Sequence, residues 1–201
     1  MNLEFKLLKL IEKEEDLSKI DLFLLENKIN LNFNYQDQLP DSETYITGSI
    51  TGQLYYQFMF KPEIFNSKKV GTYFKPLIIL LIKYGWNINF VHRFKKNSGL
   101  DDEEKYQQFN LLHKACTVYP EYLPFLLSLK EVNLNQVDGE GFSPIYLYFT
   151  YISDLKYLDM FLDRKVDLTI NNQYGQSLLK EPSFLPFYQS YKRRKVILTN
   201  L

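Results

Sequence analysis

His113 and Cys116 are the first residues to weigh for chemistry, because both lie in the short stretch NLLHKAC, residues 110–116. Cys116 is the only cysteine of the chain, and His113 is one of two histidines. A cysteine nucleophile needs a base such as imidazole within hydrogen-bond reach. Side chains three positions apart share one face of a helix. The stretch therefore fits either a catalytic pair or a scaffold element, and the scaffold interpretation requires the same spacing elsewhere without the reactive residues.

Other residues with chemical potential are sparse. His92 precedes the polar segment RFKKNSG, and we expect a loop histidine there, with a site residue as the alternative. Two histidines and one cysteine offer no recognised metal-ligand spacing. The acidic run at 101–104 lacks the alternating ligands of a calcium loop. No glycine-rich phosphate loop is present, so the sequence predicts no metal, no cofactor and no catalytic residue.

Composition limits the classes of partner. The 201 residues carry 24 basic and 24 acidic side chains, so no net charge favours nucleic acid or an anionic membrane. We expect the basic run at 192–195 to be a solvated terminal segment, with a partner contact as the alternative. The longest apolar run, residues 76–82, is too short to cross a bilayer, and no signal-peptide pattern is present. These features predict a soluble, cytoplasmic protein.

Three segments of the chain align with one another. They are QQFNLLHKAC, EGFSPIYLYF and YGQSLLKEP, which place Asn110, Ser143 and Ser177 at equivalent positions with spacings of 33 and 34 residues. A second pair, VNLNQVDGEG and VDLTINNQYG, is also 34 residues apart, and related endings occur upstream in LLIKYGWNIN and LLENKINLN. One repeated unit with insertions therefore accounts for the whole chain.

Each unit is expected to contain a helix, a turn, a second helix and an extended finger. Asn110, Ser143 and Ser177 are good helix caps, and we expect the Ser143 hydroxyl to accept a hydrogen bond from a helix amide. Pro144 suits the first helical position, where its missing N–H costs nothing. Gly141 and Gly175 suit finger turns that require positive φ.

The repeat resembles the ankyrin-repeat family. NLLHKA and SPIYLY stand where that family has its Thr-Pro-Leu-His-x-Ala signature, and VNLNQVDGEG resembles its finger. The resemblance implies an all-α fold, an ankyrin-like helix-turn-helix repeat solenoid with extended finger loops. It also implies that His113 is a structural histidine that fixes the neighbouring finger, and that Cys116 occupies a small-residue position. The scaffold interpretation is therefore preferred to a Cys–His site.

The chain departs from the family in composition and in length. Tyr146 and Tyr148 replace the signature histidine and alanine, and we expect both in the core. Insertions are expected at about 36–47, 61–72 and 93–106. We predict a single domain over 1–201 with about five units, at 1–33, 34–90, 91–136, 137–170 and 171–201. The first unit is an N-terminal cap with helices near Leu3–Glu12 and Leu17–Asn27. The last unit is truncated, because Pro182 and Pro186 interrupt its helical pattern.

The resemblance implies that finger tips and the exposed side of the first helices form a concave protein-binding face. Aromatic residues are abundant there, and tyrosine is enriched at binding hot spots. The predicted contact residues are Tyr106, Gln107, Thr117, Glu140, Phe142, Thr150, Tyr151, Tyr174 and Gln176.

The predicted function is a non-catalytic protein-binding module whose partner is another protein and which is monomeric when free. Its sharpest form is an immunity protein that neutralises a cognate bacterial toxin by direct binding, because small ankyrin-like proteins with irregular repeats resemble that class. A host-directed ankyrin effector or scaffold protein is the alternative. An enzyme that uses His113 and Cys116 is a further, weaker alternative.

Overall fold

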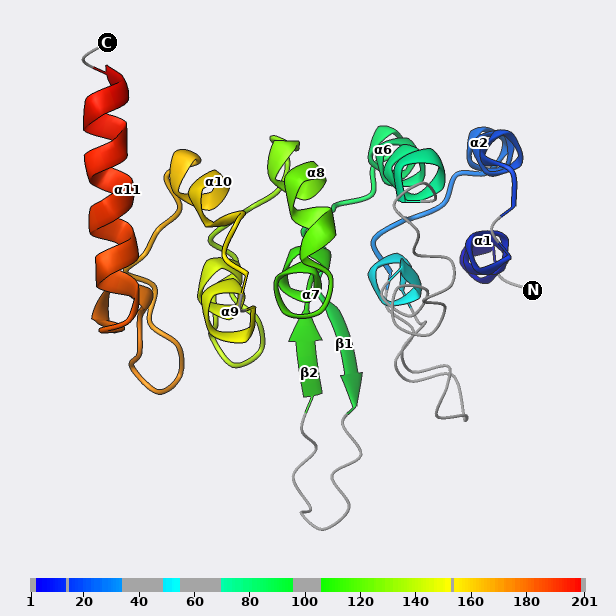
Figure 1. Cartoon of the computed structure of the whole chain (residues 1–201). Coiled ribbons are helices and arrows are strands. Elements are labelled where there is room, and N and C mark those ends of the chain that lie inside the picture. The colour runs from blue at the N-terminus through cyan, green and yellow to red at the C-terminus, as the bar shows by residue number, and fades with distance from the viewer. Residues whose placement is uncertain are drawn as a thin grey trace. The chain divides into compact units, whose positions relative to one another are not determined.

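The protein is described by a computed structural model, which covers residues 3–13, 15–33, 49–54, 70–95, 106–152 and 154–199. The chain divides into two compact units, Met1–Leu111 and Leu112–Leu201. The described residues are mostly helical, and their one sheet has two strands (Figure 1). This agrees with the prediction of a helical fold class.

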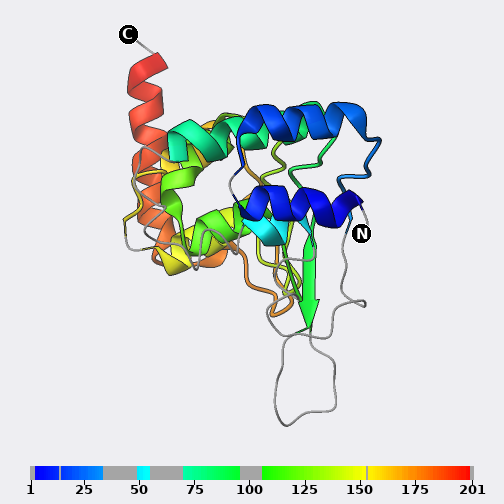
Figure 2. The ribbon, with the colours of Figure 1, turned by 90° about the vertical axis from the view of Figure 1, so that its right-hand side faces the viewer.

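The first unit begins with two helices that the sequence predicted closely. They are α1, Leu3–Glu12, and α2, Leu17–Glu26, which ends one residue before the expected Asn27. Figure 2 shows the two helices side by side and antiparallel. Leu7 and Ile11 of α1 and Ile20 and Leu24 of α2 are buried at four-residue spacings, so one apolar stripe of each helix faces inwards. Asp16 caps α2 by accepting a hydrogen bond from the Ser18 amide at 2.7 Å.

The first unit continues with short elements. Residues 50–54 are helical, and a π-helical turn, Val70–Phe74, leads into α6, Lys75–Lys83, which packs against α2. Strand β1, His92–Lys95, pairs antiparallel with β2, Tyr106–Phe109. The two ends of the predicted 93–106 insertion are therefore strand residues. The 36–47 insertion and most of the 61–72 insertion lie outside the described residues.

His92 is not the loop histidine that the sequence predicted. It is fully buried on β1, and its Nδ1 lies 2.8 Å from the Ser49 hydroxyl oxygen. The same oxygen accepts a hydrogen bond from the Gly52 amide at 3.0 Å, so Ser49 links the imidazole to the helical segment at 50–54. The prediction failed because the pairing of β1 with β2 turns this position inwards.

The second unit consists of short helices and 3-10 turns followed by the longer helix α11 (Figure 1). Its elements are α7, Leu111–Thr117; a 3-10 turn, Pro120–Tyr122; α8, Leu123–Ser128; α9, Pro144–Tyr151; α10, Leu158–Asp163; a second 3-10 turn, Leu178–Lys180; and α11, Phe184–Thr199. Helix α10 packs against both α8 and α9. Tyr146 and Tyr148 are buried as predicted, and the Tyr148 ring stacks on Phe161 with centroids 5.7 Å apart.

The helix starts differ from the prediction in one respect. Ser143 and Ser177 occupy N-cap positions with extended backbone, but neither hydroxyl forms a capping hydrogen bond. Pro144 lies at the first helical position as expected. The start of α9 is therefore set by backbone conformation and by proline, and the Ser143 side chain is buried instead.

The C-terminal segment does not end at its prolines. Pro186 lies in the first turn of the 16-residue helix α11, where a missing N–H breaks no hydrogen bond within the helix. The basic run lies on this helix and is exposed, but two of its cations bind α10. Arg194 pairs with Asp159 at 2.8 Å, and Lys195 pairs with Asp163 at 2.6 Å. The run is therefore a helical surface and not a free tail.

One hydrogen-bond pattern recurs around a buried residue in both units. A side-chain oxygen accepts from the amide two residues later at 2.8–3.0 Å, in the pairs Asn30–Asn32 and Asn87–Asn89 of the first unit and Asn133–Asn135 and Asp167–Thr169 of the second. The residue between each pair is buried. The copies within a unit are joined, because the Asn87 amide donates to Asn32 at 2.7 Å and the Asp167 amide to Asn135 at 2.8 Å. The sequence repeat is thus a repeat of local structure.

Candidate functional site

His113 is a buried residue that holds the segment before the Asp138 turn by a hydrogen bond. Its Nε2 lies 3.0 Å from the carbonyl oxygen of Gln136, which precedes the finger turn of the second unit. Burial lowers the pKa of the imidazole from 6.5 to about 4, so the ring is neutral at pH 7 and Nε2–H donates to that oxygen. This contact is the role that the family resemblance implied for His113.

Cys116 is poorly suited to nucleophilic chemistry. Its side chain is fully buried, and burial raises the pKa of the thiol well above its ordinary value. The thiolate is the reactive form of cysteine, and this environment disfavours it. The geometry around NLLHKAC therefore matches a scaffold element better than a Cys–His site.

Two further site classes find no support in the described part of the chain. No group of three or more His, Cys, Asp or Glu side chains there is arranged to hold a metal ion. No helix within the described ranges is both long enough and apolar enough to span a bilayer.

The second unit contains two hairpin turns with the same hydrogen bonds. In the first, the Asp138 amide donates to the Phe142 carbonyl at 3.0 Å, and the Asp138 carboxylate accepts from the amides of Glu140 and Phe142 at 2.9 Å. We call residues 138–142 the Asp hairpin. Residues 172–176 form the equivalent Asn hairpin. There the Asn172 amide donates to Gln176 at 2.8 Å, and the Asn172 side chain accepts from two amides at 2.9 and 3.0 Å.

The predicted glycine turns are present in both hairpins. Gly141 has φ +81° and Gly175 has φ +74°, a region that side chains disfavour. The two hairpins lie side by side, because the Gln173 amide donates to the Glu140 carbonyl at 3.1 Å. This contact allows no room beside Gly141, where a Cβ atom would lie 3.0 Å from the Gln173 nitrogen.

Four of the predicted binding residues meet at these hairpins. They are Glu140, Phe142, Tyr174 and Gln176, and we call them the hairpin patch. The rings of Phe142 and Tyr174 have centroids 6.3 Å apart, and Tyr174 is 67% exposed. Glu140 and Gln176 are also exposed. The structure therefore brings these four residues onto two adjoining hairpins, and their role in binding stays a prediction.

The Phe142 ring packs against the ring of buried Tyr146. Their centroids are 5.2 Å apart, and the Tyr146 hydroxyl donates to the Glu181 carboxylate at 2.7 Å. That interaction and burial raise the pKa of Tyr146 to about 12, so the hydroxyl stays protonated and keeps its donor role. The half-buried Phe142 ring therefore packs against a tyrosine that a hydrogen bond holds in place.

Other predicted residues lie elsewhere in the second unit. Thr117 and Thr150 are near the C-terminal ends of α7 and α9, and each hydroxyl donates back to the carbonyls three and four residues earlier. Tyr151 is 68% exposed at the end of α9. The helix separates Tyr151 from Phe142 by eight helical residues, or about 12 Å of helix length. These residues therefore do not belong to the hairpin patch.

The remaining two predicted residues lie in the first unit. Tyr106 and Gln107 are in β2, where they pair with Lys95 and Phe94. Only their main chain belongs to the described structure. Their assignment to a binding surface stays a prediction.

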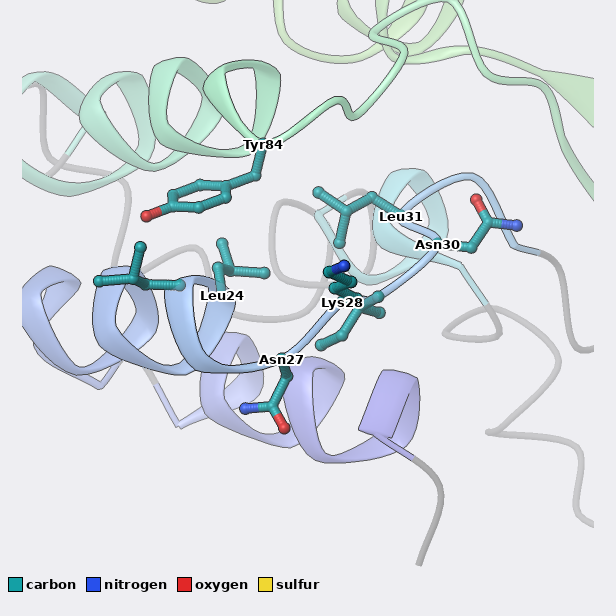
Figure 3. Close-up of a pocket in the computed structure, with 8 residues that line it drawn as sticks. Leu24, Asn27, Lys28, Asn30, Leu31 and Tyr84 are labelled. Atoms are coloured by element: carbon teal, nitrogen blue, oxygen red, sulfur yellow. The ribbon is translucent and has the colours of Figure 1, made fainter.

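The first unit has an open groove of about 470 Å³ at the end of α2 (Figure 3). The Tyr84 ring faces Leu24, and Leu31 lies beside them. The polar groups of the groove mainly hold local structure, because the Tyr84 hydroxyl donates to Asp21 at 2.7 Å and the Asn27 amide donates to the Phe23 carbonyl at 2.8 Å. The groove has no arrangement of groups that resembles a catalytic site.

Two residues with clear roles were missed by the sequence reasoning. Ser49, described above, is a buried polar residue before a helical segment, as are Asn110, Ser143 and Ser177. Its position before an apolar residue was the available signal. Arg164 donates to the carbonyls of Leu127, Leu129 and Val132 at 2.9–3.2 Å and so ties the end of α10 to the end of α8. No local motif marks that role.

Comparisons with known proteins give structural likenesses but no family assignment. No family model matches the chain, and no curated protein matches its sequence. A solved structure that resembles it is described as the Bd0816 predatory endopeptidase from Bdellovibrio bacteriovorus in complex with immunity protein Bd3460. The match has a TM-score of 0.36 and 19% identity, and it covers 85% of this chain and 86% of the other.

Proposed function

We propose that this protein is a non-catalytic protein-binding module built from ankyrin-like repeats. The observation that carries the proposal is the hairpin patch, in which an exposed tyrosine and a half-buried phenylalanine lie together on two rigid turns. Aromatic side chains provide large contact areas with few rotatable bonds, so they lose little entropy when a partner binds. The side-chain and main-chain hydrogen bonds of the turns hold this surface in place before binding.

The finer form of the proposal is an immunity protein that blocks a cognate bacterial toxin by direct contact in the cytoplasm. The irregular ankyrin-like repeats and their insertions support this form, because the resemblance implies extended binding faces with variable loops. His113 and Cys116 take no part in this function. They stabilise α7 and the finger that follows it.

The test compares two tyrosines of nearly equal exposure, Tyr174 in the hairpin patch and Tyr151 at the end of α9. Tagged wild-type protein, Tyr174→Ser and Tyr151→Ser are used to capture proteins from lysate of the source organism. We expect one stoichiometric partner with the wild type and with Tyr151→Ser, and a large loss with Tyr174→Ser. Co-expression of that partner in a host cell then tests toxicity and its suppression.

Two outcomes would contradict the proposal. A specific partner that is lost with neither variant would remove the hairpin patch from the binding surface. A captured partner that is harmless to the host cell would leave a binding module but exclude the immunity role. Thermal unfolding of both variants is the control, because both side chains are exposed and their loss should leave stability nearly unchanged.

A further inference from the structure

The hairpin patch carries a charge that suggests what it binds. Glu140 lies at the exposed tip of the Asp hairpin, and its amide donates to the Asp138 carboxylate. No ion pair or side-chain hydrogen bond of Glu140 occurs within the described ranges, whereas Lys180 donates to Asn171 and to the Gly175 carbonyl. The Asp hairpin therefore carries a carboxylate that forms no ion pair among the described residues, and its main chain is bonded to the hairpin that bears Tyr174.

Charges of both signs surround this surface, but none of them pairs with Glu140. Burial, together with the nearby charge of Glu140, raises the pKa of Asp138. Lys114 faces Asp138 from α7, but it is half-buried, and burial lowers its pKa to about 8. Glu181 adds a third carboxylate, which accepts from the Tyr146 hydroxyl. Of the nearby cations, half-buried Lys114 interacts with Asp138 and Lys180 donates to neutral oxygens, so neither is paired with the Glu140 carboxylate.

The aromatic rings suit the same kind of ligand. Tyr174 presents most of its ring to solvent, and Phe142 limits its movement from one side. A cation near the face of a tyrosine ring is attracted by the ring quadrupole. A guanidinium group also stacks flat on aromatic rings and forms paired hydrogen bonds with a carboxylate.

We propose that the hairpin patch binds an arginine side chain presented by the protein partner, with the guanidinium stacked on Tyr174 and hydrogen-bonded to the Glu140 carboxylate. This inference rests on the proposed binding function and names the chemistry of the partner at that surface. Gly175 and Gly141 form the turns, and the hydrogen bond from the Gln173 amide to the Glu140 carbonyl holds the two turns that bear these groups side by side.

The test uses a blocked Gly-Ser-Arg-Ser-Gly peptide and the same peptide with citrulline in place of arginine. Citrulline keeps the shape of the side chain but removes its charge. Amide NMR spectra of the full-length ¹⁵N-labelled protein are recorded during titration with each peptide. We expect the arginine peptide to shift the amides of Gly139, Gly141, Tyr174 and Gly175, and the citrulline peptide to shift them far less.

Matched variants locate the effect. Glu140→Gln should weaken binding of the arginine peptide about threefold, as should Tyr174→Ser, because each removes one exposed electrostatic contact. Glu121→Gln and Tyr151→Ser remove an exposed carboxylate and an exposed tyrosine elsewhere in the second unit and should leave binding unchanged. Unshifted spectra outside the hairpins show that each variant is folded.

Three results would overturn the inference. They are equal binding of the citrulline peptide, shifts centred on another surface such as the groove beside Tyr84, and insensitivity to Glu140→Gln. The broader function has its own readout. If a captured partner depends on Tyr174 but not on Glu140, the binding module stands and the arginine assignment fails.

Discussion

The Asp hairpin and the Asn hairpin have the same backbone hydrogen bonds but obtain them from different chemistry. Asp138 supplies a carboxylate that is half-buried, whereas Asn172 supplies a neutral amide that is buried. The two hairpins also differ in packing. The backbone of residues 172–173 lies against Gly141, whereas nothing lies within 4 Å of the Cβ position of Gly175. The comparison teaches that one turn geometry can be held by a titratable or by a neutral group, with different sensitivity to packing and pH.

The largest expected difference between the hairpins concerns their glycines. Gly175→Ala should lower the free energy of unfolding by about 1 kcal/mol, because alanine is strained at positive φ but its Cβ atom meets no neighbour. Gly141→Ala should cost about 3 kcal/mol, because the same strain is joined by overlap with the Gln173 nitrogen and the Asn172 Cα. Urea unfolding of the two variants measures both costs. Equal losses of unfolding free energy would show that the hairpins are not packed differently.

The second difference is the dependence of the Asp hairpin on pH through His113. The unfolded chain takes up a proton at His113 near pH 6.5, but the folded chain resists it until about pH 4. The free energy of unfolding should therefore fall by roughly 2–3 kcal/mol as pH drops from 6.5 to 4. His113→Gln keeps a donor for the Gln136 carbonyl and should lose most of this slope.

Hydrogen exchange gives a local readout of the same effect. The Gly141 amide donates to the Asp138 carbonyl, and the Gly175 amide donates to the Asn172 carbonyl. On acidification, protection relative to the intrinsic rate should fall at Gly141 before it falls at Gly175, because His113 binds just ahead of the Asp hairpin. A parallel loss at both amides, or an unchanged slope in His113→Gln, would contradict this account.

The third difference concerns removal of the two side-chain acceptors. Asn172→Ala should cost about 2 kcal/mol, because two amides lose their acceptor and the hydrogen bond to the Gln176 side chain is lost as well. Asp138→Ala should lower the free energy of unfolding by about 1 kcal/mol. Two amides again lose their acceptor, but the folded protein no longer has to bury a carboxylate, which offsets part of that loss. Urea unfolding at pH 7 measures both, and a larger cost at Asp138 would reverse the ranking.

The smallest expected effect comes from exchanging the acceptors. Asp138→Asn should stabilise the protein at pH 7 by less than about 1 kcal/mol, because Asn172 shows that an amide can make both hydrogen bonds. The pKa of Asp138 is raised on folding, so the wild type loses stability as pH rises through that pKa. The advantage of Asp138→Asn should therefore be larger at pH 7 than at pH 3. Asn172→Asp should show the opposite sign, and an advantage independent of pH would exclude the carboxylate as the cause.

Much of the local structure could be predicted from the sequence. The helices α1 and α2 were predicted to within one residue, because their apolar residues repeat at helical spacing. Gly141 and Gly175 were assigned to positive-φ turns, and His113 was assigned a structural role. The predicted binding residues are distributed over several elements, since Glu140 and Tyr174 lie on adjoining hairpins whereas Thr150 and Tyr151 lie on α9.

Failures arose where distant residues decide the outcome. His92 was expected in a loop, yet the β1–β2 pairing and Ser49, 43 residues earlier, bury it. The helix α11 was not expected beyond Pro186, but aromatic contacts support its start. The Phe184 and Phe187 rings both pack on Phe149 of α9, with centroids 5.2 and 5.9 Å away. Contacts of this range leave no local signal in the sequence.

The sequence by itself determined the period of the repeat, the positions of the turns and the residues that form them. Those features depend on groups within about five positions of each other, such as Asp138 with the amides of Glu140 and Phe142. Only the tertiary structure decided that the Glu140 carbonyl meets the Gln173 amide and that Arg164 holds the end of α8. These pairs lie more than 30 residues apart, and their proximity follows from how whole helices pack, which residue types and spacing do not specify.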